Sequence, residues 1–358
     1  MTSTHLHTPT PDATSRSVRL SDPRDHPASR AWASLHPELP SPTAVRKLQE
    51  KTKGAVYRLD GAGIDGSAIV AKRSSPARIL QERAVYEQIL PALDVPTVRY
   101  FGFVEELGAA CCWIFVDNAG DGMYASSDAE HRSLAARWLA RLHTAGARCR
   151  PAAQLPDRGP AFYLAQLRAA CDTIGRYATN AALTSDDTAV LRAIVRHCEV
   201  AAARWPEVER LCERTPRTFV HGDFAPKNVR LRNDQRSTDL ALIAFDWGSA
   251  GWGSIAADLV QWSESDGRGT FERWNYWAHP DLATYSGAVR HLWPELDVEL
   301  LRHLATIGKL FRCLVCIALS AQSFATPWIE RAACNMRIYE AEMVDALRGA
   351  GWAVGDAR

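Results

Sequence analysis

Two short acidic segments constrain this chain more than any other feature of its sequence. The first is His221-Gly-Asp-Phe-Ala-Pro-Lys-Asn228, and the second, Ala244-Phe-Asp-Trp-Gly248, follows about one hairpin later. Each comes directly after a β-like run, which places its polar side chains at a strand end. The alternative is a pair of acidic turns that cap strands. Four residues at fixed spacing, followed by Asp-x-Gly, rarely arise by chance, so the pattern favours a functional site.

The residue types in these segments suit phosphoryl transfer to an alcohol. That reaction needs a carboxylate near the attacking hydroxyl and oxygen ligands for the magnesium ions that bridge nucleotide phosphates. Asp223, on a tight loop, can accept the hydroxyl proton. Asn228, five residues later, can coordinate one metal ion, and Asp246, at the end of the next strand, can coordinate the other or both.

With these motifs the chain resembles the aminoglycoside phosphotransferase family, which shares the protein-kinase-like fold with choline, homoserine and other small-molecule kinases. The resemblance covers roughly residues 43–348. The loop resembles H-G-D-x-x-x-x-N, where protein kinases usually carry H-R-D. Gly222, and the absence of an Ala-Pro-Glu signature after the second segment, therefore argue against a eukaryotic-type protein kinase. The resemblance implies a catalytic base at Asp223, Mg²⁺ ligands at Asn228 and Asp246, and structural roles for His221 and for Asp258, the aspartate that braces this loop.

A cation for the nucleotide phosphates is predicted at Lys72, which ends a β-like run. A lysine on a strand can pair with the α- and β-phosphates while a carboxylate on the following helix orients it. Glu82 is the predicted partner and matches the family's helix glutamate, with Glu87 as the alternative. Protein kinases usually place a second lysine two residues after the base. Here Ala225 occupies that position, and whether Lys227 makes the phosphate contact or is simply exposed stays open.

The literal G-x-G-x-x-G at Gly61–Gly66 is not expected to bind phosphate. A dinucleotide-binding loop would open a helix, whereas strand-like residues follow this one. It also ends only six residues before Lys72, which leaves no room for two antiparallel strands. Gly54, 18 residues before that lysine, is the predicted phosphate-loop glycine, and residues 60–67 are predicted to form a hairpin turn. The resemblance further implies that the backbone at Val116 and Asp117 meets the adenine edge, where an ordinary turn is the alternative.

Hydrophobic patterning predicts an α+β fold of protein-kinase-like, bilobal type. Residues 1–40, rich in Pro, Ser, Thr, His and Arg, are expected to form a flexible segment without a secretory signal. Residues 41–118 alternate short strands with one helix, about 76–90, and predict an antiparallel nucleotide-binding lobe. Residues 119–358 predict a mainly helical lobe, with helices after the capping box Ser127–Glu130 and at about 160–178, 185–204, 297–323 and 327–348.

The acceptor site is predicted in an acidic, aromatic-rich part of the second lobe. Residues 247–300 contain eight Asp or Glu and three Arg, whereas residues 41–91 have a surplus of four positive charges. An acidic rim would concentrate a polycationic acceptor such as an aminoglycoside, although solvated helix faces and core packing explain such features more often. The candidate acceptor residues are Glu264, Asp266, Trp274, Tyr276 and Trp277.

Composition and net charge disfavour other classes of protein. The 358-residue chain has a net charge of +1 and 47% hydrophobic residues, which disfavours a general nucleic-acid or membrane binder. Nine scattered cysteines fit packing thiols in the cytosol. We expect a cytoplasmic ATP- or GTP- and Mg²⁺-dependent enzyme that phosphorylates a hydroxyl of a small molecule, an antibiotic before a metabolite. A regulatory pseudokinase is less consistent, because every residue of the predicted site is present. The oligomeric state is not predicted.

Overall fold

The computed structural model describes residues 22–51, 54–106, 111–149, 155–233, 240–262, 277–326 and 329–352. The chain divides into two compact units. Unit 1 contains residues up to Ile79 together with Arg99–Asn118, and unit 2 contains Leu80–Val98 and Ala119–Arg358. The break after Asn118 coincides with the lobe boundary expected from the sequence. Residues 80–98, which were expected in the first lobe, belong to unit 2.

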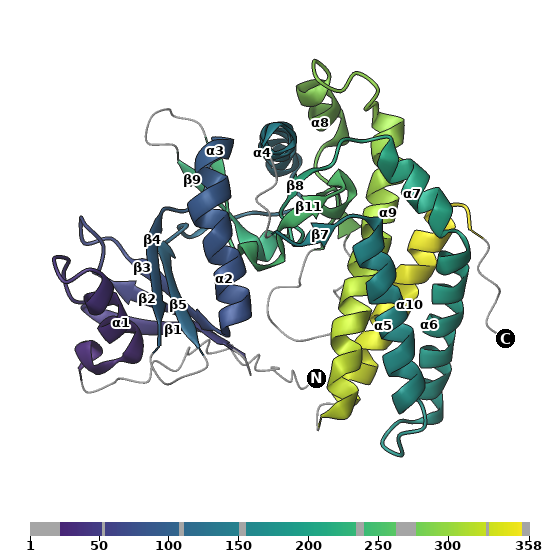
Figure 1. Cartoon of the computed structure of the whole chain (residues 1–358), viewed down its shortest axis with the longest axis horizontal. Coiled ribbons are helices and arrows are strands. Elements are labelled where there is room, and N and C mark those ends of the chain that lie inside the picture. The colour runs from purple at the N-terminus through teal and green to yellow at the C-terminus, as the bar shows by residue number, and fades with distance from the viewer. Residues whose placement is uncertain are drawn as a thin grey trace, which may run out of the picture. The chain divides into compact units, whose positions relative to one another are not determined.

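Unit 1 is built on a five-stranded antiparallel sheet of order β1-β2-β3-β5-β4 (Figure 1). The predicted hairpin turn at 60–67 is confirmed, because β2 and β3 pair across it in register. Gly61 and Gly66 take positive φ angles of 74° and 69° there, a conformation that glycine adopts without a steric penalty. The elements of unit 1 are η1 Pro23–Asp25, α1 Pro27–Leu35, β1 Ala44–Lys51, β2 Gly54–Asp60, β3 Ile69–Ser74, β4 Tyr100–Glu105 and β5 Cys112–Asp117.

The expectation of a flexible segment over residues 1–40 is wrong for residues 22–40. Here α1 begins after His26, whose ring accepts a hydrogen bond from the amide of Ala28, and Pro27 occupies its first turn. Trp32 is fully buried, and its ring lies 5.4 Å from that of Phe115 on β5. This helix therefore covers one face of the sheet and belongs to the core of unit 1.

Unit 2 is mainly helical. In Figure 1 the long helices α5, α6, α9 and α10 lie side by side, and α9 and α10 contact each other along their length. The predicted helices at 160–178, 185–204, 297–323 and 327–348 are confirmed within a few residues. The helices of this unit are α3 Leu90–Leu93, α4 Ala129–Arg148, α5 Pro160–Tyr177, α6 Ser185–Ala203, α7 Trp205–Glu213, α8 Leu282–Val289, α9 Val298–Ala321 and α10 Ile329–Gly349.

Two helical starts differ in detail from the prediction. The N-cap of α4 is Asp128 rather than Ser127, since the Asp128 carboxylate accepts the amides of Glu130 and His131. The helix expected at 76–90 is α2, Pro76–Ala84, continued by a π-helical turn, Val85–Ile89, and then by α3. From Leu80 onward it belongs to unit 2, where the Gln81 side chain donates to the carbonyl of Ala250 at 2.9 Å.

Short strands of unit 2 surround the two acidic segments. They form sheets of order β10-β9-β6, β7-β11-β8 and β12-β13. Their bounds are β6 Gly122–Met123, β7 Asp157–Arg158, β8 Thr218–Val220, β9 Val229–Asn233, β10 Leu240–Ala244, β11 Gly251–Gly253, β12 Gln261–Trp262 and β13 Trp277–Ala278. The single-turn helices are η3 Pro226–Asn228, η4 Trp247–Ser249, η5 Ile255–Asp258 and η7 Gln322–Ala325.

By length and composition, the segment Val298–Ala325, which is α9 with η7, could cross a membrane. It is instead a central helix of unit 2, with 61% of its most apolar stretch buried inside the structure. Its apolar residues are therefore explained by packing against α5 and α10.

Candidate active site

The loop His221–Asn228 follows β8, and a buried carboxylate accepts hydrogen bonds from its first two residues. Asp258, at the end of η5, has no exposed surface. Its Oδ2 accepts the amide of His221 at 2.7 Å, and its Oδ1 accepts the amide of Gly222 at 2.8 Å. His143 on α4 donates to the same Oδ2 from Nε2 at 3.2 Å. A buried carboxylate must find such donors, and here they fix the entry of the loop.

His221 is committed to hydrogen bonds within the loop. Its Nδ1 accepts the amide of Asp223 at 3.3 Å, so Nε2 carries the proton and donates to the carbonyl of Phe245 at 3.1 Å. The ring is completely buried. The His221 ring thus joins the loop to the residue before Asp246, which is a positioning geometry.

Asn228 lies next to Asp223. Its Nδ2 donates to the carbonyl of Asp223 at 2.9 Å and to the carboxylate Oδ2 at 3.1 Å. The amide of Phe245 donates to the carbonyl of Asn228 at 3.0 Å, so the start of the second acidic segment is tied to this residue. With Nδ2 used for these bonds, the Oδ1 atom of Asn228 is the atom left to accept or to coordinate.

Asp246, two residues after the end of β10, takes a left-handed backbone conformation with φ of 65°. Few residues other than glycine adopt this conformation, and it is frequent at functional sites. Burial raises the pKa of the Tyr86 phenol well above its ordinary value, and the nearby carboxylates of Glu82 and Asp246 raise it further. Glu82 is itself 3% exposed. Both carboxylates thus lie close to one buried phenol in unit 2.

Cations surround the carboxylate of Asp223. Arg312 on α9 donates from Nη1 to Oδ1, and the Nζ atom of Lys227 lies 3.3 Å from Oδ2. Burial alone would raise the pKa of Asp223. The positive charges of Arg312 and Lys227 outweigh burial and the repulsion from Asp246, so the pKa lies below its ordinary value. Asp223 is therefore ionised at neutral pH.

The sequence does not predict the roles of Arg312 and His143. Arg312 stands out only as an interruption of an apolar run, and its position 89 residues after Asp223 gives no spacing signal. His143 lies in the middle of α4 with nothing in the sequence to connect it to Asp258. Lys227, left open between phosphate contact and exposure, contacts Asp223 and is 35% exposed.

The donor set fits Mg²⁺. The oxygens of Asn228 and Asp246 are hard ligands, and a magnesium ion is commonly held by one or two protein side chains together with substrate phosphates. Within the described residues no group of three or more His, Cys, Asp and Glu side chains could hold a metal on its own. All nine cysteines are free thiols, and four of them, Cys112, Cys198, Cys212 and Cys313, are buried.

Four of the residues predicted for the nucleotide, Gly54, Lys72, Val116 and Asp117, lie on β2, β3 and β5 of unit 1. Lys72 pairs in register with Val56 and Ile114 in the middle of the sheet. Gly54 opens β2 opposite Ser74, and a Cβ atom there would lie 2.7 Å from the carbonyl of Arg73. Close approach between strands thus accounts for a glycine at this position.

Other predicted residues stay predictions. Val116 and Asp117 end β5, where the amide of Asp117 donates to the carbonyl of Arg99 at 2.7 Å. Glu82, the expected partner of Lys72, belongs to unit 2, while the alternative, Glu87, forms an ion pair with Arg83 at 2.9 Å. Glu264, Asp266, Trp274 and Tyr276 lie outside the described residues, and only the backbone of Trp277 is described, in β13.

The fold is that of the protein-kinase-like phosphotransferases. The aminoglycoside phosphotransferase APH(4)-Ia, in a ternary complex with ADP and hygromycin B, is similar with a TM-score of 0.56 at 13% identity, over 91% of this chain and 99% of that one. A GDP complex of an aminoglycoside 2'-phosphotransferase-IIIa mutant is similar with a TM-score of 0.57 at 13% identity, over 88% and 97% of the two chains. An ethanolamine kinase from Plasmodium vivax is similar with a TM-score of 0.52 at 13% identity, over 85% and 80%. No curated protein is significantly similar in sequence.

Residues 44–301 match the model of the phosphotransferase enzyme family. This match spans most of the chain and includes both acidic segments. The chain therefore belongs to this family and is a phosphotransferase, as expected from its sequence.

Proposed function

We propose that the chain is an ATP- or GTP-dependent O-phosphotransferase that uses Mg²⁺ and phosphorylates a hydroxyl of a small molecule in the cytoplasm. One observation carries this proposal: Asp223, Asn228 and the segment of Asp246 are joined by direct hydrogen bonds around a loop that Asp258 anchors. The family match and the small-molecule kinases among the similar structures support it.

In this proposal Asp223 orients the acceptor hydroxyl and takes its proton as the acceptor oxygen bonds to the γ-phosphorus. The bond from that phosphorus to the bridging oxygen breaks, and the nucleoside diphosphate leaves. Asn228 and Asp246 would hold Mg²⁺, which neutralises charge on the phosphates. Lys72 would bind the α- and β-phosphates with Glu82 as its orienting partner, Gly54 would approach the phosphates, and the backbone at Val116 and Asp117 would meet the base.

An antibiotic such as an aminoglycoside is the first candidate for the acceptor. The similar structures include an aminoglycoside phosphotransferase bound to hygromycin B, an aminoglycoside 2'-phosphotransferase and a spectinomycin phosphotransferase bound to spectinomycin. The ethanolamine kinase makes a metabolite kinase the second candidate. In the first case the acidic and aromatic residues Glu264, Asp266, Trp274, Tyr276 and Trp277 would line the acceptor site.

ADP release tests the proposal. Purified protein with Mg-ATP is offered a panel of aminoglycosides, nucleoside antibiotics, macrolides, choline and homoserine. We expect one class to stimulate release, and we expect EDTA to abolish it because the phosphates lose their metal. ATP binding without stimulated release by any acceptor would contradict the proposal and favour a regulatory nucleotide-binding role.

A further inference from the structure

Arg312 on α9 reaches the loop of Asp223 with its guanidinium group. Arg312 stands between Phe311 and Cys313, which are both buried, in an apolar helix. Its side chain is 24% exposed, and its Nη1 donates to Oδ1 of Asp223. Burying a guanidinium is costly unless a carboxylate pairs with it, so a surface-facing role does not explain this residue.

The packing of α9 sets the position of Arg312. One helical turn earlier, Gly308 approaches η5 so closely that a Cβ atom would lie 2.1 Å from the carbonyl of Ala256. Ala256 is two residues before Asp258, whose carboxylate holds the start of the catalytic loop. On the other side, the ring of Phe311 stacks on Tyr163 at 3.8 Å. Both α9 and the loop of Asp223 therefore contact the single-turn helix η5. This shared contact fixes the distance between Arg312 and Asp223.

The hydrogen bonds of Asp223 leave room for one more donor. An ionised carboxylate offers about four lone-pair positions. Within the described residues, Asn228 and Lys227 approach Oδ2, and Arg312 approaches Oδ1. The position left over is therefore on Oδ1, the oxygen that Arg312 also holds. Without Arg312 the carboxylate could rotate about its χ2 bond and lose this arrangement.

We propose that Arg312 is a positioning residue for phosphoryl transfer, which holds Asp223 in the orientation that presents one lone pair of Oδ1 to the acceptor hydroxyl. This inference rests on the proposed function in that Asp223 is taken as the group that meets the acceptor. In this proposal the guanidinium of Arg312 does not contact the nucleotide. The acceptor hydroxyl would then bind to a carboxylate whose orientation the guanidinium of Arg312 fixes.

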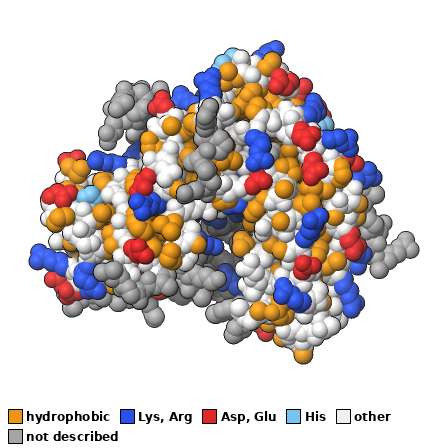
Figure 2. All heavy atoms as spheres, viewed as in Figure 1, with side chains coloured by type: hydrophobic (Ala, Val, Ile, Leu, Met, Phe, Trp, Pro, Cys, Tyr) orange, Lys and Arg blue, Asp and Glu red, His pale blue; other side chains and the backbone are white. Residues whose placement is uncertain are grey.

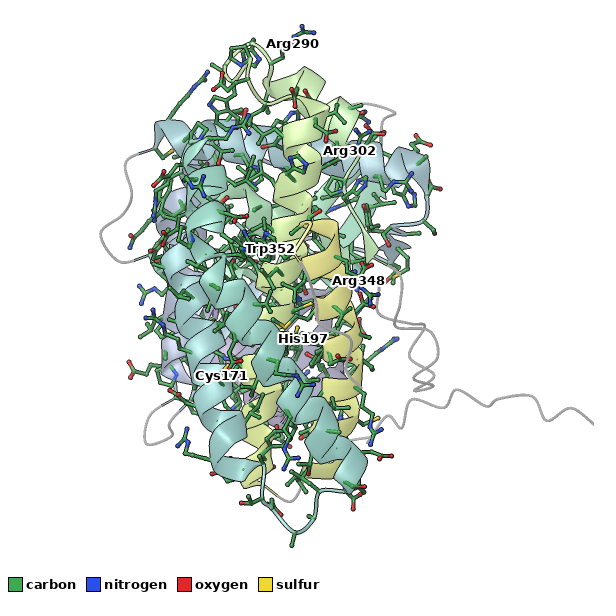
Figure 3. The ribbon with its side chains drawn as sticks, turned by 90° about the vertical axis from the view of Figure 1, so that its right-hand side faces the viewer. Cys171, His197, Arg290, Arg302, Arg348 and Trp352 are labelled. Atoms are coloured by element: carbon green, nitrogen blue, oxygen red, sulfur yellow. The ribbon has the colours of Figure 1, made fainter. Side chains whose placement is uncertain are left out.

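The test uses two variants. Arg312→Gln removes the positive charge, whereas Arg312→Lys keeps a positive charge but replaces the planar guanidinium by an ammonium group. Arg302→Gln is the matched control, because Arg302 lies on the same helix, is 63% exposed and pairs with Glu299 rather than with Asp223 (Figure 3). Thermal unfolding checks that each variant is folded. If Arg312→Gln does not fold, Arg312→Lys carries the test.

The first readout is hydrogen exchange, followed by NMR in protein with isotope-labelled asparagine and glycine. In Arg312→Gln we expect the side-chain amide protons of Asn228 to exchange about tenfold faster, because their acceptor on Asp223 is no longer fixed. The backbone amide of Gly222, which is bonded to Asp258, should keep its rate. Unchanged exchange at Asn228, or an equal change at Gly222, would overturn the positioning role. Arg312→Lys should give an intermediate change in the same direction.

The second readout is steady-state kinetics with the acceptor found in the panel. We expect kcat of Arg312→Gln to fall by about 10- to 100-fold with the KM for ATP unchanged, and Arg312→Lys to recover part of the loss. Wild-type kcat in Arg312→Gln would contradict the inference. If the wild-type protein phosphorylates no acceptor, the proposed function fails, while the exchange experiment still decides whether Arg312 positions Asp223.

Discussion

Gly222 shows why this loop carries glycine where protein kinases usually have arginine. Its φ of 73° lies in the left-handed region, and a Cβ atom would lie 2.3 Å from the carbonyl of Ser249. Its amide must also reach Oδ1 of Asp258. Any side chain at this position would push the loop away from η4 and from its anchor.

We therefore expect Gly222→Ala to destabilise the protein by about 1–3 kcal/mol, through the strained backbone and the displaced carbonyl. Urea unfolding measures this change. Gly175→Ala is the control, because a Cβ atom there meets nothing within 4 Å. Equal stability of Gly222→Ala and the wild type would show that the loop adopts another conformation.

At the residue scale, the sequence predicts what is local and misses what is distant. Asp223 and Asn228 are five residues apart, so one motif contains both. Arg312 and His143 reach the same loop from two helices, and no spacing in the sequence connects them to it. Trp32 is missed for a different reason, because the proline- and serine-rich composition around it is typical of flexible segments although one buried indole is enough to fix α1.

At the scale of elements, α9 connects the helical bundle to the loop of Asp223. Its strong apolar periodicity makes the helix itself predictable, but not the side on which Gly308 allows close approach to η5. Short strands such as β7 and β11 are likewise not predicted, because two or three residues carry no periodicity.

Replacing Gly308 by alanine tests this connection. We expect a loss of about 1–3 kcal/mol in the free energy of unfolding, since the new methyl group overlaps the Ala256 carbonyl. Gly287→Ala on α8 is the matched control, with nothing within 4 Å of the added atom. It should be neutral or stabilising by about 0.4–1 kcal/mol. A stable Gly308→Ala variant would contradict the close packing of α9 against η5.

The start of α6 provides a pH-dependent test of the bundle. Asp187 accepts the amide and hydroxyl of Thr184 and pairs with Arg337 on α10 at 2.6 Å. Burial alone would raise the pKa of Asp187, but these partners lower it below its ordinary value. Asp187 therefore stabilises the fold above its unfolded-state pKa, and this contribution is lost as the pH falls through the lower, folded-state pKa.

Asp187→Asn should thus lower the free energy of unfolding by about 1 kcal/mol at pH 7. The difference from the wild type should shrink under acidic conditions, where the wild-type carboxylate also becomes protonated. Urea unfolding at several pH values measures this. A difference that does not depend on pH would contradict the ionised cap.

At the scale of the whole molecule, the family match and the fold agree with the sequence-based expectation of a phosphotransferase. On the face drawn in Figure 2, acidic and basic side chains are interspersed over unit 2, in keeping with a net charge of +1. The acceptor is the part that sequence predicts least, because the residues that select it need only line a surface and need no fixed spacing. The residue types of the proposed reaction centre follow instead from the chemistry of phosphoryl transfer.

Transfer of labelled γ-phosphate from ATP to the acceptor tests the central claim most directly, with Asp223→Asn compared with the wild type. Asp186→Asn, an exposed aspartate at the start of α6, is the control. The proposed role predicts a phosphorylated acceptor with the wild type and the control, and a rate reduced by about 100-fold or more in Asp223→Asn with ATP binding retained. Wild-type transfer by Asp223→Asn would contradict the assignment of this carboxylate to the reaction.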